Sequence, residues 1–175
     1  MIKIFKVVLY ILFAIYLFVA LLPKENLYYK ILQEVEKYGI EVDTKKLQDD
    51  YLSFTVFDSI VYYQGLEICE VSKVKTSTTL YDTKIYIPSI IFSGMIKEFI
   101  PNTLRQLTIT YSIKDIYKIK LQGYLGKVVI DGIVDLQKHI LQIELIVPAK
   151  LKHKYKTLRK FMKPTSKGYR YEYKF

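Results

Sequence analysis

The chain of 175 residues has one cysteine, two histidines and no tryptophan. A single thiol, Cys69, excludes an internal disulfide, and we expect it to be a small buried hydrophobe. His139 and His153 stand alone, without further cysteines or paired acids, so no zinc-binding pattern is present. The scarcity of these residues removes the commonest metal and nucleophile chemistries, and we predict no metal site and no cofactor.

The remaining signals for catalysis are equally few. No glycine-rich phosphate loop occurs, because Gly123 and Gly126 lack the lysine and hydroxyl residue that would follow, and they are typical of a hairpin turn. The acids Asp49, Asp50, Asp131 and Asp135 fall at loop starts or on the polar side of a strand, where solvated surface is expected. We therefore predict no catalytic residues and a protein that is not an enzyme.

The chain is instead rich in apolar and basic residues. Apolar residues make up 51% of it, tyrosine alone has 17 copies, and the formal net charge is +10. Such a composition excludes a disordered tail and supplies one domain with a core. The basic excess is concentrated at 150–174, and a basic surface suits nucleic acid or an anionic lipid surface as partner.

The opening of the chain is its longest apolar segment. Residues 7–22 (VVLYILFAIYLFVALL) are uninterrupted by charge and follow Lys3 and Lys6. About 20 residues at 1.5 Å each are enough to cross a hydrocarbon core of about 30 Å. A cleavage site for a signal peptide would need small residues, whereas Phe18 lies two positions before Ala20. The pattern favours an uncleaved transmembrane anchor at 1–23, with a removed leader as the alternative.

The lysines set the expected orientation. Lys3, Lys6 and the terminal amine outweigh Lys24 beside Glu25, so the amino end is expected in the cytoplasm. We therefore predict a single-pass protein of the bacterial inner membrane, with residues 24–175 forming a β-rich periplasmic domain.

After the anchor, hydrophobic periodicity predicts a helix and then strands. Residues 26–38 repeat apolar side chains at spacings of three and four before Gly39, whereas 40–48 and 51–81 alternate with period two. Gln64 and Gly65 mark a hairpin turn. Residues 85–92 contain Pro88, which removes a ladder donor and demotes the segment to an edge strand or a connection.

The second half of the chain gives the clearest pattern. Four strands are predicted within 104–148, joined by turns at 114–115, 123–126 and 137–138, and another strand at 169–175 follows a helix at 149–163. We predict an α+β fold: an N-terminal transmembrane helix, then a curved, mostly antiparallel β-sheet, half-barrel or taco-like, with two short helices.

The predicted helix at 149–163 has lysines on one side and apolar residues on the other. Such a helix can lie on an anionic membrane, and we name Lys152, Lys156 and Lys160 as possible membrane-surface contacts, with a merely solvated face as the alternative. Because the domain is expected outside the cytoplasm, nucleic acid is not a predicted partner. The apolar face of the sheet is either a groove for an acyl chain or partner segment, or a core covered by the helices.

Three stretches resemble a known family. They are LPKENLYYKILQEVEKYGIEVDTKKLQ after the apolar run, GKVVIDGIVDLQKHILQIELIVPAKL, and the closing GYRYEYKF. In this order they resemble protein N of the type II secretion system and, more loosely, the AsmA-like, bridge-type periplasmic proteins. The resemblance implies a single-span inner-membrane protein with a β-rich taco-shaped domain, acting in secretion-platform assembly or lipid transport. No functional residue is carried over.

These observations together predict a non-enzymatic, membrane-anchored periplasmic component of a secretion or envelope transport apparatus that acts by protein-protein interaction. The alternative is a lipid-binding or lipid-transfer module with an apolar groove. The expected partners are the inner membrane, envelope or secretion proteins and, in the second case, a lipid.

Overall fold

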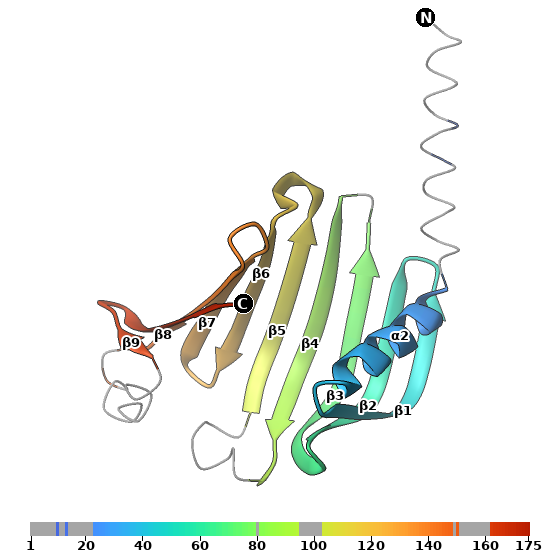
Figure 1. Ribbon diagram of the computed structural model, residues 1–175, viewed down its shortest axis with the longest axis horizontal. Coiled ribbons are helices and arrows are strands. Elements are labelled where there is room, and N and C mark those ends of the chain that lie inside the picture. Colours follow the sequence, from blue (N-terminus) through green and yellow to red (C-terminus); the bar gives the residue numbers. More distant parts are fainter. Residues whose placement is uncertain are drawn as a thin grey trace, which may run out of the picture.

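The computed structural model describes Tyr10, Phe13 and residues 23–79, 81–94, 103–148, 150 and 162–175. In this part of the chain, ten strands form one open antiparallel sheet in the order β1-β2-β3-β4-β5-β6-β7-β8-β10-β9 (Figure 1). The order follows the chain except at the end, so each strand from β1 to β8 pairs with its sequence neighbours. Short turns between alternating segments favour this meander.

The strands are long in the first half of the sheet and shorter in the second. The bounds are β1 Ile40–Asp50, β2 Ser53–Tyr63, β3 Leu66–Thr78, β4 Asp82–Phe92, β5 Thr103–Ser112, β6 Lys118–Leu125, β7 Val128–Asp135, β8 Ile140–Ile146, β9 Lys163–Pro164 and β10 Gly168–Lys174. A 3-10 turn, η2 (Ile113–Asp115), connects β5 to β6. The four strands expected within 104–148, and the hairpin turn at Gln64 and Gly65, are confirmed.

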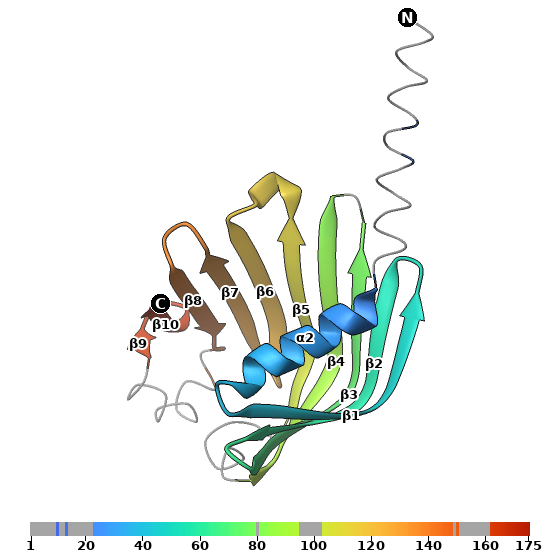
Figure 2. The same cartoon turned by 45° about the vertical axis from the view of Figure 1, so that its right-hand side comes forward.

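One α-helix, α2 (Lys24–Glu36), precedes the sheet and lies against its first strands. Strands β1–β3 curl around this helix, so the face that it covers is the concave one (Figure 2). Three contacts fix it. The Lys24 ammonium pairs with Asp49 at 2.8 Å, the Tyr28 hydroxyl lies 2.6 Å from the Thr44 hydroxyl, and the Tyr28 ring lies 5.6 Å from the Phe54 ring.

The predicted fold class is wrong as a whole. It combined a transmembrane helix and two short helices with a half-barrel sheet, whereas the described residues form an open ten-stranded sheet with a single α-helix. None of the helices in the described part of the chain has the length and the hydropathy that a bilayer crossing requires. Apart from Tyr10, Phe13 and Pro23, the predicted anchor at 1–23 lies outside the described residues.

The predicted localisation depended on that span and is corrected with it. A single-pass inner-membrane protein with a periplasmic domain requires a spanning helix, and the described residues contain none. The prediction rested on hydropathy alone, which measures how apolar a run of residues is.

The sheet changes direction along a line that crosses its first five strands. The line passes through Lys45, Asp58, Ser72, Pro88 and Gln106, one residue on each of β1–β5, and we call it the crease. Asp58 and Gln106 have φ of 49° and 52°, a left-handed conformation that is rare for residues other than glycine. Along each of these strands the inward-facing residues are three apart at the crease and two apart elsewhere, while the pairing of β1–β5 keeps the same register on both sides of it.

The crease explains why Pro88 is accepted inside the sheet. The expectation that residues 85–92 would be an edge strand or a connection is wrong, because they belong to β4, which pairs with both β3 and β5. Neither ladder includes Pro88 itself. A proline at an irregular position costs no ladder hydrogen bond, so the strand continues past it.

Candidate functional site: the concave face of the sheet

We call the face of the sheet that α2 covers the inner face and the opposite one the outer face. Phe54, Val56 and Ser59 of β2 lie on the inner face and are buried. Residues directly opposite each other on antiparallel strands point to the same side, so the pairing carries the inner face from β2 to β10.

Three rows of paired residues make up the inner face. The middle row is Phe54, Thr76, Ile85, Ile109, Leu121, Gly132, Ile143 and Tyr171. A row toward one end of the strands is Ser59, Val71, Ile90, Leu104, Leu125 and Val128. A row toward the other end is Thr83, Tyr111, Ile119, Val134, Leu141 and Tyr173. None of the residues in these rows carries a charge.

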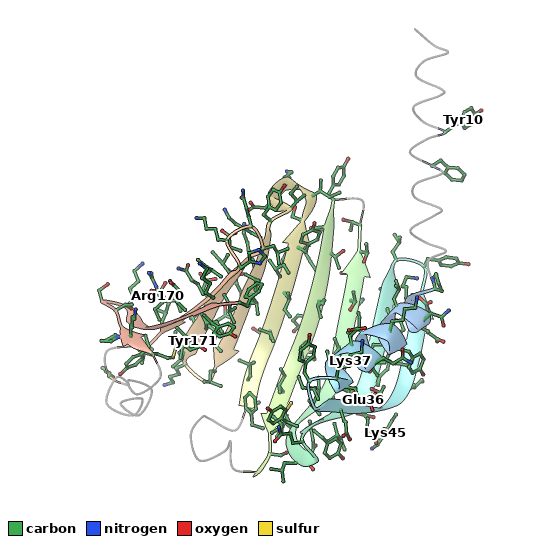
Figure 3. The ribbon with its side chains drawn as sticks, viewed as in Figure 1. Tyr10, Glu36, Lys37, Lys45, Arg170 and Tyr171 are labelled. Atoms are coloured by element: carbon green, nitrogen blue, oxygen red, sulfur yellow. The ribbon has the colours of Figure 1, made fainter. Side chains whose placement is uncertain are left out.

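The charged residues of β4–β8 all lie on the outer face. They are Asp82, Lys84, Arg105, Lys118, Lys120, Asp131, Asp135 and Glu144. One outer row, from Tyr86 through Thr108, Gln122, Asp131 and Glu144 to Arg170, shows the contrast with the inner rows. Arg170 and Tyr171, labelled in Figure 3, are consecutive on β10 and therefore lie on opposite faces.

Burial is uneven over the inner face. A tight cluster of Leu104, Leu125, Val128, Leu145, Val147 and Tyr169 is buried toward the end of the strands where β6 turns into β7. In the middle row, Ile85, Ile109, Leu121 and Ile143 are only half-buried. The contacts of α2 are with β1 and β2, so this helix leaves the middle of the inner face uncovered.

Cys69 lies on the inner face, paired between Val61 and Phe92. Burial, with a smaller contribution from the nearby Glu67 carboxylate, raises the pKa of its thiol. A raised pKa keeps the thiol protonated and poorly nucleophilic, so the geometry agrees with the small buried hydrophobe expected from the sequence.

A separate cavity of about 350 Å³ lies between the end of α2 and β1. Its lining includes the apolar residues Leu32, Ile40 and Val42 and the acidic residues Glu36, Glu41 and Asp43. In the part of the chain that the structure describes, no three histidine, cysteine or acidic side chains are grouped closely enough to hold a metal ion.

The residues singled out in the sequence are not gathered at one site. His139 lies in the β7–β8 turn, where its ring meets the Phe175 ring at 5.7 Å. Asp49 pairs with Lys24, and Asp135 accepts a hydrogen bond from the Lys138 amide. The possible membrane contacts Lys152, Lys156 and Lys160, together with His153, lie outside the described residues.

The sequence could have shown the separation of charge from apolar surface in β6, where buried or half-buried residues alternate with exposed ones and both lysines fall in the exposed set. It could not show that the rows join into one face across the crease. Two of the five crease residues, Asp58 and Gln106, have a left-handed backbone conformation, and nothing in their residue types predicts it. No family model matches the chain, and neither the curated proteins nor the solved structures contain a match to it.

Proposed function

We propose that the protein binds the apolar chains of lipids on its inner face and has no catalytic role. The observation that carries the proposal is the complete segregation of charge in β4–β8: every charged side chain is on the outer face, while the inner face offers Ile, Leu, Val and Tyr. Contact between water and an apolar face of this extent is unfavourable, and an acyl chain bound on the face would remove that contact.

The dimensions support the same proposal. The middle row crosses eight strands, and seven spacings of about 4.8 Å make it about 34 Å long. The row has half-buried isoleucines and a leucine in the middle and ends at Tyr171, whose side chain combines an apolar ring with a polar tip. A curved apolar strip of this length can hold an extended acyl chain while the tyrosines and threonines at its margins remain hydrated.

The test is lipid binding by the full chain and by matched variants. We expect organic extracts of the purified protein to contain lipid near one molecule per chain. The double variant Ile109→Thr with Ile143→Thr should retain several-fold less, because threonine keeps the β-branched shape but adds a polar group to the inner face. Ile133→Thr makes the same substitution on the outer face and should retain lipid like the unchanged protein.

Circular dichroism must show that both variants keep the sheet. The proposal fails if the folded protein carries no lipid and takes up none from a fluorescent fatty acid. It also fails if the inner-face and outer-face variants lose equal amounts of lipid, because the loss would then not depend on which face carries the substitution.

A second candidate is protein binding in a secretion or envelope transport apparatus, and the exposed edge of the sheet favours it. In the described sheet β1 pairs only with β2, and its 11 residues leave the other edge open to an added strand. A photocrosslinker at Asp43 of β1 should then capture one defined protein that a crosslinker at Lys120, inside the sheet, does not capture. Equal capture from both positions would argue against binding at the edge.

A further inference from the structure

Four turns and the end of the last strand meet at one end of the sheet. Because β1–β8 form a meander, the β1–β2, β3–β4, β5–β6 and β7–β8 turns all lie at this end, the upper one in Figure 1. Phe175 joins them, since its amide donates to the His139 carbonyl at 2.9 Å. The same end is where the chain enters α2.

Each of these tips carries an exposed large apolar or aromatic side chain. The rim, as we call this set, consists of Tyr51, Tyr81, Ile113, Tyr117, Leu136 and Phe175. Tyr51 is 80% exposed, Tyr81 68% and Ile113 60%. The opposite end is mixed. The β6–β7 turn there has Gly126 and Lys127 at its tip, whereas Tyr63 and Leu66 flank the β2–β3 turn and are exposed, as is Tyr38 before β1.

The charges around the rim favour an anionic partner. Asp82 pairs with Lys84, and Asp115 lies near both Lys118 and Lys120. Asp49, beside the β1–β2 turn, pairs with Lys24. Asp50 and Asp135 accept hydrogen bonds from Ser53 and the Lys138 amide and keep their negative charge, so lysines outnumber aspartates at this end. Lys114, Lys138 and Lys174 make no ion pair with any described residue. These ammonium groups are available to phosphate groups on a surface facing the rim.

The spacing of the tips distinguishes a lipid surface from a protein surface. Successive tips are two strands apart, or about 10 Å, with hydrated turn backbone between them. Separate apolar tips of this kind can each enter a fluid interface, where tyrosine is favoured at the level of the headgroups. A protein partner would instead need one continuous, closely fitting surface.

From these observations we infer that the rim docks on a phospholipid bilayer, with the turn tips in the interface and the lysines at the headgroups. The contact is peripheral and uses the tips of turns and the end of β10. The inference rests on the proposed lipid binding, because the inner row that contains Tyr111, Ile119 and Val134 lies directly below the rim. An acyl chain leaving the bilayer at the rim would reach the inner face without crossing water.

The test places an environment-sensitive fluorophore at single positions of the full chain. Cys69→Ser removes the native thiol, and single cysteines at Ile113 or Leu136 then report on the rim. Lys127→Cys reports on the opposite end and Ile133→Cys on the outer face, where the native isoleucine is also exposed. The vesicles contain phosphatidylcholine with a minor fraction of phosphatidylglycerol. Because residues 7–22 are apolar enough to associate with vesicles by themselves, the readout is the environment of each label and not total binding.

On adding vesicles, the rim labels should shift to shorter emission wavelength, and a lipid-borne quencher should quench them several-fold more than the labels at 127 and 133. The inference is overturned if the rim labels stay in water while the protein sediments with the vesicles. It is also overturned if they shift without lipid and in proportion to protein concentration, which would indicate a second copy on the rim.

Failure here and failure of the proposed function give different results. Protein that carries extractable lipid but keeps its rim labels in water overturns the docking alone. Protein without lipid, whose rim labels nevertheless enter the interface, overturns the lipid-binding proposal alone.

Discussion

Among the glycines, Gly168 leaves the least room for an added Cβ atom. It begins β10 opposite Ile146, and a Cβ added there would overlap the backbone carbonyl of Leu145. Because backbone cannot rotate away as a side chain can, Gly168→Ala must push β10 from β8. We expect it to lower the free energy of unfolding by about 3 kcal/mol or more, measured by urea denaturation.

Gly126→Ala is the matched control for this substitution. Gly126 has a φ of 65° but open space around its Cβ position, so alanine there meets only the left-handed backbone cost of about 1–2 kcal/mol. Equal losses for the two variants would contradict the contact between Gly168 and Leu145.

Cys69 gives a prediction about reactivity and pH. Burial raises the pKa of its thiol above the ordinary value, so the folded protein holds this proton more tightly than the unfolded chain does. The resulting contribution to stability is complete below the ordinary thiol pKa and is lost as pH rises through the folded one. We expect iodoacetamide at mildly alkaline pH to label Cys69 many times faster in urea than in the native protein, as followed by mass spectrometry. Equal rates would show that the inner face is open at this position.

At the scale of elements, the crease depends on left-handed residues within strands. Gln106 has a φ of 52° in the middle of β5, where the pairing with β6 shifts between Arg105 and Thr108. A β-branched side chain is strongly disfavoured in this conformation, whereas glycine adopts it freely. We expect Gln106→Val to be less stable than Gln106→Gly by at least about 1 kcal/mol in urea denaturation.

Thr108→Val and Thr108→Gly are the control pair, because Thr108 is a strand residue two positions away without positive φ. At position 108 the valine variant should be more stable than the glycine variant. If valine were also the better residue at position 106, the crease would not be held by this conformation.

The elements show which parts of the fold could be predicted. Helix α2 and strands β5–β8 follow from local periodicity, because each has one covered side and a short connection to its neighbour. Strand β4 was misjudged, since the rule against proline in a sheet assumes a regular ladder and Pro88 lies where the ladder is interrupted. A run such as 85–92 cannot by itself reveal an irregularity that depends on four neighbouring strands.

The same limit applies to the candidate site and to the fold class. Alternation in the sequence predicted an apolar face and left open whether it is a groove or a covered core. The extent of that face from β2 to β10 is a property of the pairing, as is the meeting of Tyr51, Ile113 and Phe175 at one end. The membrane-span prediction rested on hydropathy alone, and no helix of the described residues has the length and hydropathy for a crossing.

For the whole molecule, burial predicts a gradient of stability across the sheet. The largest buried cluster joins β5–β8 and β10, whereas β1 is an edge strand with no fully buried residue. Amides exchange through local opening, and opening is easiest where few apolar contacts are lost. We therefore expect residues 40–50 to exchange at least about tenfold faster than residues 118–135, measured by hydrogen exchange and mass spectrometry of the native chain. Uniform exchange would mean that the sheet opens as one unit. Protection of 40–50 equal to that of 118–135 at all protein concentrations would mean that β1 is not an open edge, and would remove the support for a partner that adds a strand there.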